Sequence, residues 1–176
     1  SFSAISITGN IFTCIDVASD FAFIVVKPFG AGHYLNGLSV TGNVFRTVDG
    51  TIDRIEKLDD SIATLNFGRT VNVIFDNNTF NGVIDPTQSP ASLSFEQNTD
   101  ADTWVIEGAP YMPFGGRLRV MEAFVLRTRI QSGSDDVHTV PWAETQTGAN
   151  RDEVHLHWEK PCRGTIQVRI RCDHPL

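Results

Sequence analysis

The sequence predicts an all-β protein in which coils of a parallel β-helix are followed by an antiparallel β-sandwich. Three observations predict this fold. An eight-residue phrase recurs in the first half of the chain, apolar residues alternate with polar ones, and turn residues interrupt the second half at short intervals. The 176 residues are 41% hydrophobic and 20% charged, which is typical of a folded domain and not of a disordered chain.

The repeated phrase is ISITGNIF at 5–12, LSVTGNVF at 38–45 and, more loosely, VIFDNNTF at 73–80. Its period-two alternation predicts a strand. The Gly and Asn residues that follow predict a sharp bend, because both tolerate left-handed backbone conformations. The phrase returns after 33 and then 35 residues, a period too short for four-stranded propeller blades and suited to stacked coils.

Equivalent positions of stacked coils lie above one another, so the phrase predicts an Asn ladder and an interior column of Phe12, Phe45 and Phe80. The runs FAFIVVK and TIDRIEKL predict a second strand in each coil. We expect the variable segments 27–37 and 59–70 to form loops that leave the stack at one corner. The end of a coil stack needs a cover. Since the first phrase begins at residue 5, we expect either a longer protein or partner chains that cover this end.

Pro86 and Pro90 indicate a boundary near residue 85. We therefore expect residues 1–84 to form the last coils of a right-handed parallel β-helix and residues 85–176 to form the sandwich. Its predicted strands are SLSFEQ, DTWVIEG, RLRVMEAFVLRTRI, VHTVPWAET, EVHLHWEK and GTIQVRIRC. A sandwich of about ninety residues is marginally stable alone, so we expect it to dock on the coils or on copies of itself.

Charge and composition exclude several classes of protein. The net charge of −7 disfavours binding to nucleic acid, and the longest apolar run, FAFIVV, is too short to insert into a membrane. The three cysteines, Cys14, Cys162 and Cys172, have neither metal-ligand spacing nor the number for a disulfide framework. No phosphate loop or nucleophile motif is present, and we expect no cofactor.

Two sets of residues are candidates for acid–base or metal chemistry. Asp49, Asp53 and Asp59 are candidate catalytic acids, because β-helix enzymes that cleave polysaccharides use clustered carboxylates. The segment VDGTID also reads as an ordinary turn. His155 and His157 share one face of a predicted strand. A zinc site needs three or four fixed donors, and no spacing in the sequence identifies a third ligand, for which His138 and Glu153 are the candidates. We therefore expect a solvated pair and no metal.

Arginines on predicted strands are candidate carbohydrate ligands. The rigid guanidinium fork suits carboxylate or sulfate groups of an acidic glycan, and aromatic rings stack on sugars. The alternative is a solvated strand face whose charge is balanced by glutamates. The predicted carbohydrate-binding residues are Tyr34, Arg127, Arg129, Arg169 and Arg171.

The coil phrases, together with VNVIFDNNTFNGVIDPTQSPASLSF, PFGGRLRV and VHLHWEKPCRGTIQVRIRCDHPL, carry a family resemblance over nearly the whole chain. The chain resembles the C-terminal region of the pectate-lyase-like or glycoside-hydrolase-28-related proteins of Rhodobacter-type bacteria, which include head-spike proteins of gene transfer agents. The resemblance implies a structural spike protein on the surface of a phage-like particle, made in the bacterial cytoplasm. It further implies contact with the capsid or other spike proteins, a homo-oligomer for which we expect a trimer, and binding to capsular or cell-surface polysaccharide.

The alternative is a polysaccharide depolymerase, a glycoside hydrolase or lyase, with catalytic acids partly upstream and a contribution from Asp49, Asp53 or Asp59. The paired-Asp signatures of polygalacturonases cannot be read in this chain, and RIEK at 54–57 resembles their basic strand only superficially. We therefore expect no enzymatic activity. A third possibility is a tail that serves only oligomerisation or folding.

Overall fold

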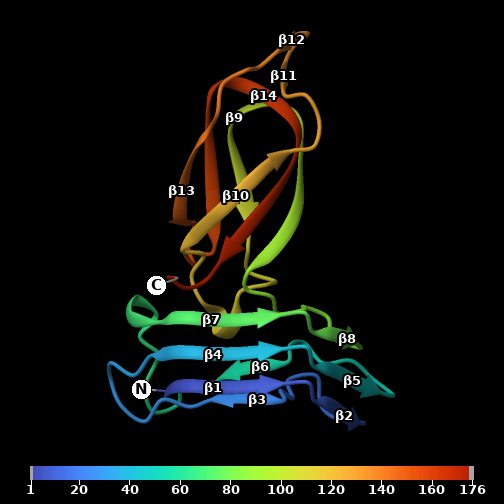
Figure 1. The fold of residues 1–176 in the computed structure, drawn as a ribbon, viewed down its shortest axis with the longest axis vertical. Coiled ribbons are helices and arrows are strands. Elements are labelled where there is room, and N and C mark those ends of the chain that lie inside the picture. The colour runs from blue at the N-terminus through green and yellow to red at the C-terminus, as the bar shows by residue number, and fades with distance from the viewer. Residues whose placement is uncertain (1, 175–176) are drawn as a thin grey trace.

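The computed structural model describes residues 2–174 and confirms the all-β fold. Stacked parallel layers form the first half, and an antiparallel sheet region stands on top of them (Figure 1). Residue 85 lies between the last strand of the coils and the first strand of the antiparallel region. Within the described residues, no helix is both long enough and apolar enough to cross a membrane.

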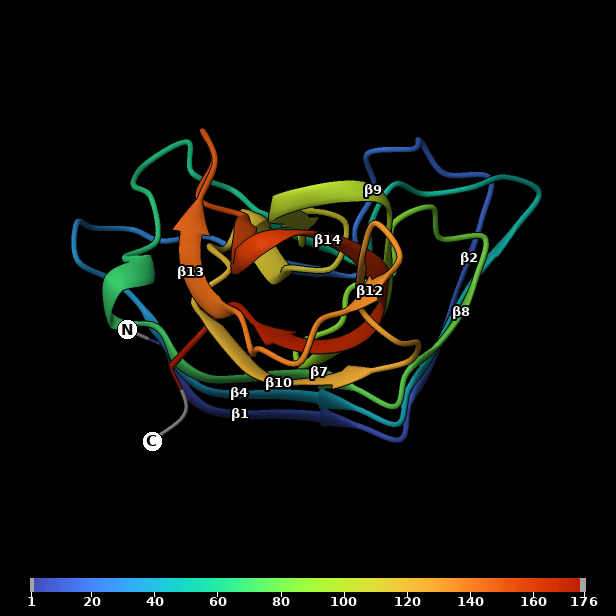
Figure 2. The same ribbon diagram turned by 90° about the horizontal axis from the view of Figure 1, so that it is seen from above.

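The coils build three parallel sheets, whose outline is visible down the stack in Figure 2. The first sheet contains β1 (Phe2–Thr8), β4 (Leu35–Thr41) and β7 (Val71–Asp76). The second contains β2 (Ile11–Ile15), β5 (Val44–Val48) and β8 (Thr79–Asn81). The third contains β3 (Ile24–Val26) and β6 (Glu56–Leu58). The sequence did not separate the second sheet from the first, because the bend between them is only two residues long.

The predicted ladder and column inside the coils are both confirmed. The Phe12 and Phe45 rings stack with centroids 5.0 Å apart, and the Phe45 and Phe80 rings with centroids 6.1 Å apart. At the bend, the backbone N–H of Asn10 donates to Oδ1 of Asn43 at 2.9 Å, and that of Asn43 donates to Oδ1 of Asn78 at 3.0 Å. Each amide side chain thus satisfies backbone groups that the bend would leave unpaired.

Two very long strands organise the second half, where the sequence predicted four shorter ones. They are β9 (Ala91–Glu107) and β14 (Glu153–Arg171). The two strands pair antiparallel along most of their length, with register shifts between His157 and Cys162 and between Cys162 and Gly164. The prediction of separate strands was wrong, because the expected turns are bends at which both partners curve together and pairing resumes.

The shorter elements complete the second half and the coil corner. They are β10 (Val120–Leu126), β11 (Gln131–Ser132), β12 (Asp135–Asp136), β13 (Trp142–Thr147) and the 3₁₀ turns η1 (Phe67–Arg69) and η2 (Pro113–Gly115). Strand β13 pairs with the first part of β14 and β10 with its last part.

Because β9 and β14 both curve, the antiparallel sheet folds back on itself into two facing parts (Figures 1 and 2). Their shared core centres on Trp104, which is fully buried. Its ring lies 6.0 Å from Phe95, in the other half of β9, and 4.9 Å from Trp158. The indole N–H of Trp104 donates to the carbonyl oxygen of Cys162 at 3.1 Å, so its one polar group is paired at the bend.

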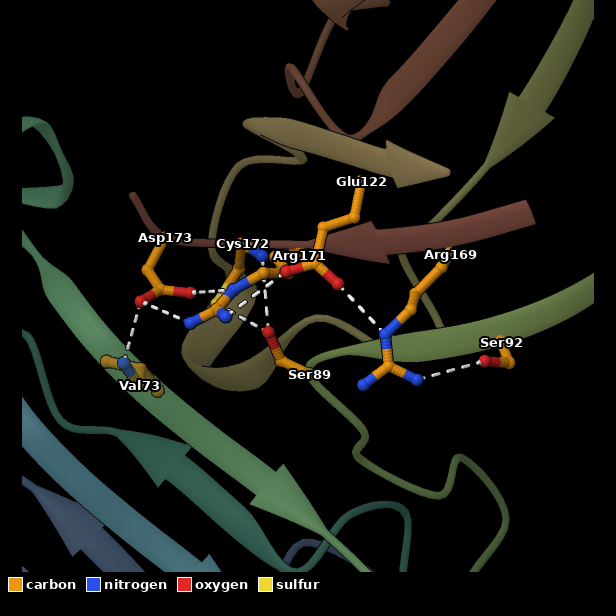
Figure 3. Close-up of polar contacts among 8 residues, drawn as sticks. All are labelled: Val73, Ser89, Ser92, Glu122, Arg169, Arg171, Cys172 and Asp173. Atoms are coloured by element: carbon orange, nitrogen blue, oxygen red, sulfur yellow. Dashed lines mark hydrogen bonds and ion pairs between the residues drawn. The ribbon is translucent and has the colours of Figure 1, made fainter. Parts of the chain in front are cut away.

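The antiparallel region covers the β7 edge of the coil stack. The backbone N–H of Phe75 donates to the Ser89 carbonyl at 2.9 Å, and the N–H of Ser89 donates back at 3.1 Å. The next outward N–H of β7, on Val73, donates to Oδ2 of Asp173 at 2.8 Å (Figure 3). These contacts occupy the backbone groups that an uncovered parallel sheet would expose.

The Asp173 carboxylate is fully buried and is paired with a guanidinium. Nε and Nη2 of Arg171 donate to its two oxygens, each at 3.1 Å, and Nη1 of Arg171 reaches Glu122 at 3.2 Å (Figure 3). Ser89 lies beside this pair, and its hydroxyl accepts from the N–H of Cys172 at 3.3 Å. Burial of these charges is tolerated because each has several partners.

A second buried carboxylate also joins the two halves, but here the coils supply the carboxylate and the antiparallel half supplies the N–H. Glu56, on β6 of the coils, has a fully buried side chain and accepts from the backbone N–H of Phe114 at 3.1 Å. Arg54 pairs with Glu56 at 2.9 Å, and Nη2 of Arg54 donates to the Met112 carbonyl at 2.7 Å. The hydroxyl of Thr87 also donates to Glu56. Each half of the chain therefore supplies a carboxylate to a backbone N–H of the other.

Replacing the middle ring of the Phe column tests the packing of the coils. Phe45→Ala is expected to lower the free energy of unfolding by about 3–5 kcal/mol, because Phe45 is fully buried between two rings. Phe29→Ala is the control, since that ring is 69% exposed, and its effect should stay within about 0.5 kcal/mol. Urea unfolding measures both, and equal losses would contradict an interior column.

The buried ion pair can be tested by removing one partner and then both. Asp173→Ala is expected to cost about 3–5 kcal/mol of stability, because the N–H of Val73 loses its acceptor and Arg171 keeps a largely buried charge with Glu122 as its remaining acidic partner. The double variant Asp173→Ala/Arg171→Met should lose less than the single one. Asp136→Ala breaks an exposed pair with Arg129 and should cost less than about 1 kcal/mol in the same urea titration. We call each buried carboxylate, with its arginine and the backbone N–H that it accepts from the other half, a carboxylate clamp. A loss for Asp173→Ala no larger than that of the control argues against the Asp173 clamp.

Candidate functional site

The coil stack carries a groove along the β3–β6 sheet. Its first depression, of about 580 Å³, continues into a neighbour of about 150 Å³, and the two share Asp20, Phe21 and Lys57. A third depression, of about 340 Å³, also includes Lys57 and reaches Phe114 at the junction. We call this surface the β3–β6 groove and define it by Asp20, Phe21, Asp53, Lys57, Asp59 and Asp60.

An aromatic ring forms part of the groove wall. Phe21 is 36% exposed, and its ring contacts that of Phe23 edge-on with centroids 5.2 Å apart. Phe23 in turn lies 5.7 Å from Phe12 and 5.6 Å from Phe45, so the exposed ring rests on the interior column. The sequence did not single out Phe21, because the run FAFIVVK reads as a strand in the coil.

The polar groups of the groove include two ion pairs that connect neighbouring coils. Lys57 lies 3.3 Å from Asp20, and Lys27 lies 2.7 Å from Asp59. The hydrogen bond from Lys27, aided by donors of Ser61, holds the pKa of Asp59 well below its ordinary value. Asp59 therefore stays a carboxylate that accepts hydrogen bonds, and it is unsuited to protonate a glycosidic oxygen at neutral pH.

The three candidate catalytic acids do not gather at one point. Asp53 and Asp59 line adjoining depressions of the groove, whereas Asp49 lies at an exposed turn and lines neither. Asp49 has φ of 58°, which fits the alternative prediction of an ordinary turn before Gly50. Of the three, only Asp53 and Asp59 are placed to contact a groove ligand.

The predicted carbohydrate-binding residues lie in three separate places. Tyr34, at the coil corner, lies under the guanidinium of Arg69, whose carbon is 4.2 Å from the ring centroid. Arg127 and Arg129 line a depression of about 560 Å³ that follows β10. The structure therefore leaves their role in carbohydrate binding a prediction and places them on different surfaces.

Arg169 and Arg171 lie at the junction and are already paired (Figure 3). Nε of Arg169 donates to Glu122 at 2.9 Å, which fits the alternative of a charge-balanced strand face. Arg171 is only 9% exposed and bonds Asp173 and Glu122. Its position thus favours a structural role, which sequence alternation alone did not indicate.

The histidine pair gains a partner that the sequence did not indicate. His155 and His157 lie on β14, and Glu144, on β13, brings a carboxylate within 4.8 Å of a ring nitrogen of each. Glu153 bonds His155 at 2.9 Å, whereas the cluster does not include His138. The third potential ligand comes from a neighbouring strand and could be found only from the strand register.

The cysteines offer no activated nucleophile among the buried thiols. All three are free, as expected. Burial raises the pKa of Cys162 to about 11 and that of Cys172 to about 12, so neither forms an appreciable thiolate at neutral pH.

A further depression of about 600 Å³ lies along the outer edge of β9. It is lined by Gln88, Tyr111 and residues from both halves of that strand. It is the main alternative to the groove as a ligand site, because it also combines an aromatic ring with polar groups. It contains none of the acids or arginines that the sequence indicated.

Comparison of the chain with protein-family models, with curated proteins and with solved structures finds no match in any of the three. The family resemblance described above therefore stays a prediction.

The Lys27–Asp59 pair predicts a measurable pH dependence. Lys27→Met is expected to raise the pKa of Asp59 toward 3.8. Because the folded pKa is depressed, the pair's stabilisation is fully present above about pH 4 and is lost as pH falls toward the folded pKa. The carboxyl carbon shift of Asp59, followed by NMR during acid titration, measures this change. Lys57→Met, which removes the partner of Asp20, should leave the titration unchanged, and an ordinary pKa in the unsubstituted chain contradicts the pairing.

Proposed function

We propose that the chain is the polysaccharide-binding, non-catalytic part of a structural spike protein, and that the β3–β6 groove holds the glycan. The observation that carries the proposal is the groove itself, a surface across stacked coils in which an exposed ring adjoins hydrogen-bonding carboxylates. Sugar rings present apolar faces that stack on aromatic side chains and hydroxyl groups that donate to carboxylates.

The charge of the groove favours one kind of glycan. The residues that line its depressions include the acids Asp20, Asp53, Glu56, Asp59 and Asp60 against the bases Arg54 and Lys57. Lys27 offsets the charge of Asp59, so an excess of acid remains, and the chain has a net charge of −7. A uronate-rich polymer would be repelled, so the groove suits neutral or amino sugars. This differs from the acidic glycan that the arginines suggested, because those arginines do not line the groove.

A binding role is favoured over cleavage by the state of the groove acids. Glycosidases need one protonated and one ionised carboxyl group at a fixed separation. Asp59 is held ionised by Lys27, and Asp49 lies outside the groove. A spike needs a rigid body that presents a binding surface. The regular coils and the two buried carboxylates, Glu56 and Asp173, that join the halves make the chain suited to that role. Attachment to a phage-like particle, assembly into a trimer and contact with capsid proteins belong to the same proposal and rest on the resemblance.

Replacing the exposed ring tests the proposed glycan site. Phe21→Ala is expected to weaken binding to a purified neutral capsular polysaccharide about tenfold, because one aromatic stacking contact is lost. Calorimetry or co-sedimentation with the polysaccharide measures the affinity. Phe29→Ala, an exposed ring that does not line the groove, should bind normally. Unchanged affinity in Phe21→Ala, with loss in Tyr111→Ala, would move the site to the β9 edge.

Product analysis in the same incubation separates binding from cleavage. A binding protein leaves the length distribution of the polysaccharide unchanged. New reducing or unsaturated ends that disappear in Asp53→Asn would instead establish a depolymerase with Asp53 in its catalytic site.

A further inference from the structure

The outer face of the antiparallel region carries a cluster of imidazole and carboxylate groups, separate from the β3–β6 groove. Val154 and Leu156 point into the core, so His155 and His157 lie on the outer face of β14. Strand β13 places Glu144 opposite His155 and Trp142 opposite His157. Three side chains that can bind a metal are thus brought together by the register of two adjacent strands.

The distances between the donor atoms suit a single ion. One ligand atom from each of Glu144, His155 and His157 lies within 4.8 Å of the other two, and Oε2 of Glu144 is 3.2 Å from Nε2 of His157. Two donors of one tetrahedral Zn²⁺ are about 3.3 Å apart. Small side-chain rotations therefore suffice to close the set, and two imidazoles with one carboxylate are a donor set that zinc accepts.

We propose that Glu144, His155 and His157 bind one Zn²⁺ or a similar late first-row divalent cation, with water in the remaining position. The proposal is independent of the glycan groove and of the spike assignment, because none of the three residues lines that groove. The site joins β13 to β14, so the bound ion would hold the shorter strand to the longer one.

Neighbouring residues already orient one of the ligands. Nδ1 of His157 lies 3.3 Å from the hydroxyl of Thr103, which engages that nitrogen and leaves Nε2 directed at Glu144. The Trp142 ring stacks on the imidazole of His157, with centroids 4.1 Å apart and an interplanar angle of 23°. Such outer contacts fix the orientation of a metal-binding histidine and contribute to affinity.

The charge of this face also favours a cation. Glu153 lies 2.9 Å from Nε2 of His155 and stands directly opposite Glu107 in the strand register. Like charges directly opposite each other on adjacent strands are unfavourable. A divalent cation beside His155 would offset this repulsion. Without an ion, the same residues form two partly exposed histidine–glutamate pairs, and that arrangement is the alternative that the experiment must exclude.

The test uses the whole chain, freed of metal with a chelator and titrated with Zn²⁺ by calorimetry and with Co²⁺ by absorption. We expect one ion per chain and the intense visible bands of four-coordinate cobalt. The melting temperature should rise by about 5–10 °C when free Zn²⁺ is a hundredfold above its dissociation constant. Absence of saturable binding overturns the proposal and leaves the histidine–glutamate pairs.

Matched variants locate the ion. His157→Ala, His155→Ala and Glu144→Gln should each weaken Zn²⁺ binding at least a hundredfold, and Thr103→Val, which removes a positioning contact, about tenfold. His138→Ala is the control, because this exposed histidine lies outside the cluster. Glu144→Gln on an exposed strand position keeps the shape of the side chain, and circular dichroism checks its fold. Wild-type affinity in a folded Glu144→Gln, or loss in His138→Ala, rejects this ligand set.

Discussion

The outer edge of β7, which must be covered, is the constraint on which the rest of the structure depends. A stack of parallel coils ends in a row of unpaired backbone groups, and such an edge either finds partners or invites aggregation. Here Ser89 and Asp173 provide those partners. They lie just before β9 and just after β14, so the cover uses both ends of the antiparallel region. The two strands that form most of that region are therefore anchored at their bases.

The two clamps share one local design. In each, an arginine precedes an acid by two residues on the chain, Arg54 with Glu56 and Arg171 with Asp173. Each acid accepts a backbone N–H from the other half of the molecule. A buried carboxylate is costly when isolated, and the adjacent arginine offsets this cost. The pairs thereby fix the relative position of the two halves with directional contacts, which apolar packing alone would not do.

The coils could be predicted because each repeated phrase contains the alternation of a strand, the residues of a bend and an aromatic ring. The stacked rings of Phe12, Phe45 and Phe80 confirm that prediction. Sequence reasoning divided each of β9 and β14 into two strands, which was wrong. Turn residues in one strand do not show that its partner strand bends at the same place and that pairing continues beyond the bend. The site was only partly predictable. The candidate acids Asp53 and Asp59 do line the groove, but Phe21 was read only as part of a predicted strand. The partnership of Glu144 with two histidines depends on strand register, which one sequence does not contain.

The residues that cover the β7 edge are far apart in the sequence, and this has a consequence for folding during synthesis. Asp173 follows Val73 by 100 residues, so at about 5–20 residues per second a ribosome needs about 5–20 s to supply it. For that interval the nascent coils carry an unprotected β7 edge, available to equivalent strands on neighbouring polysomal chains. The time needed to synthesise the segment from Val73 to Asp173 would thus decide whether a coil closes on its own chain or on another.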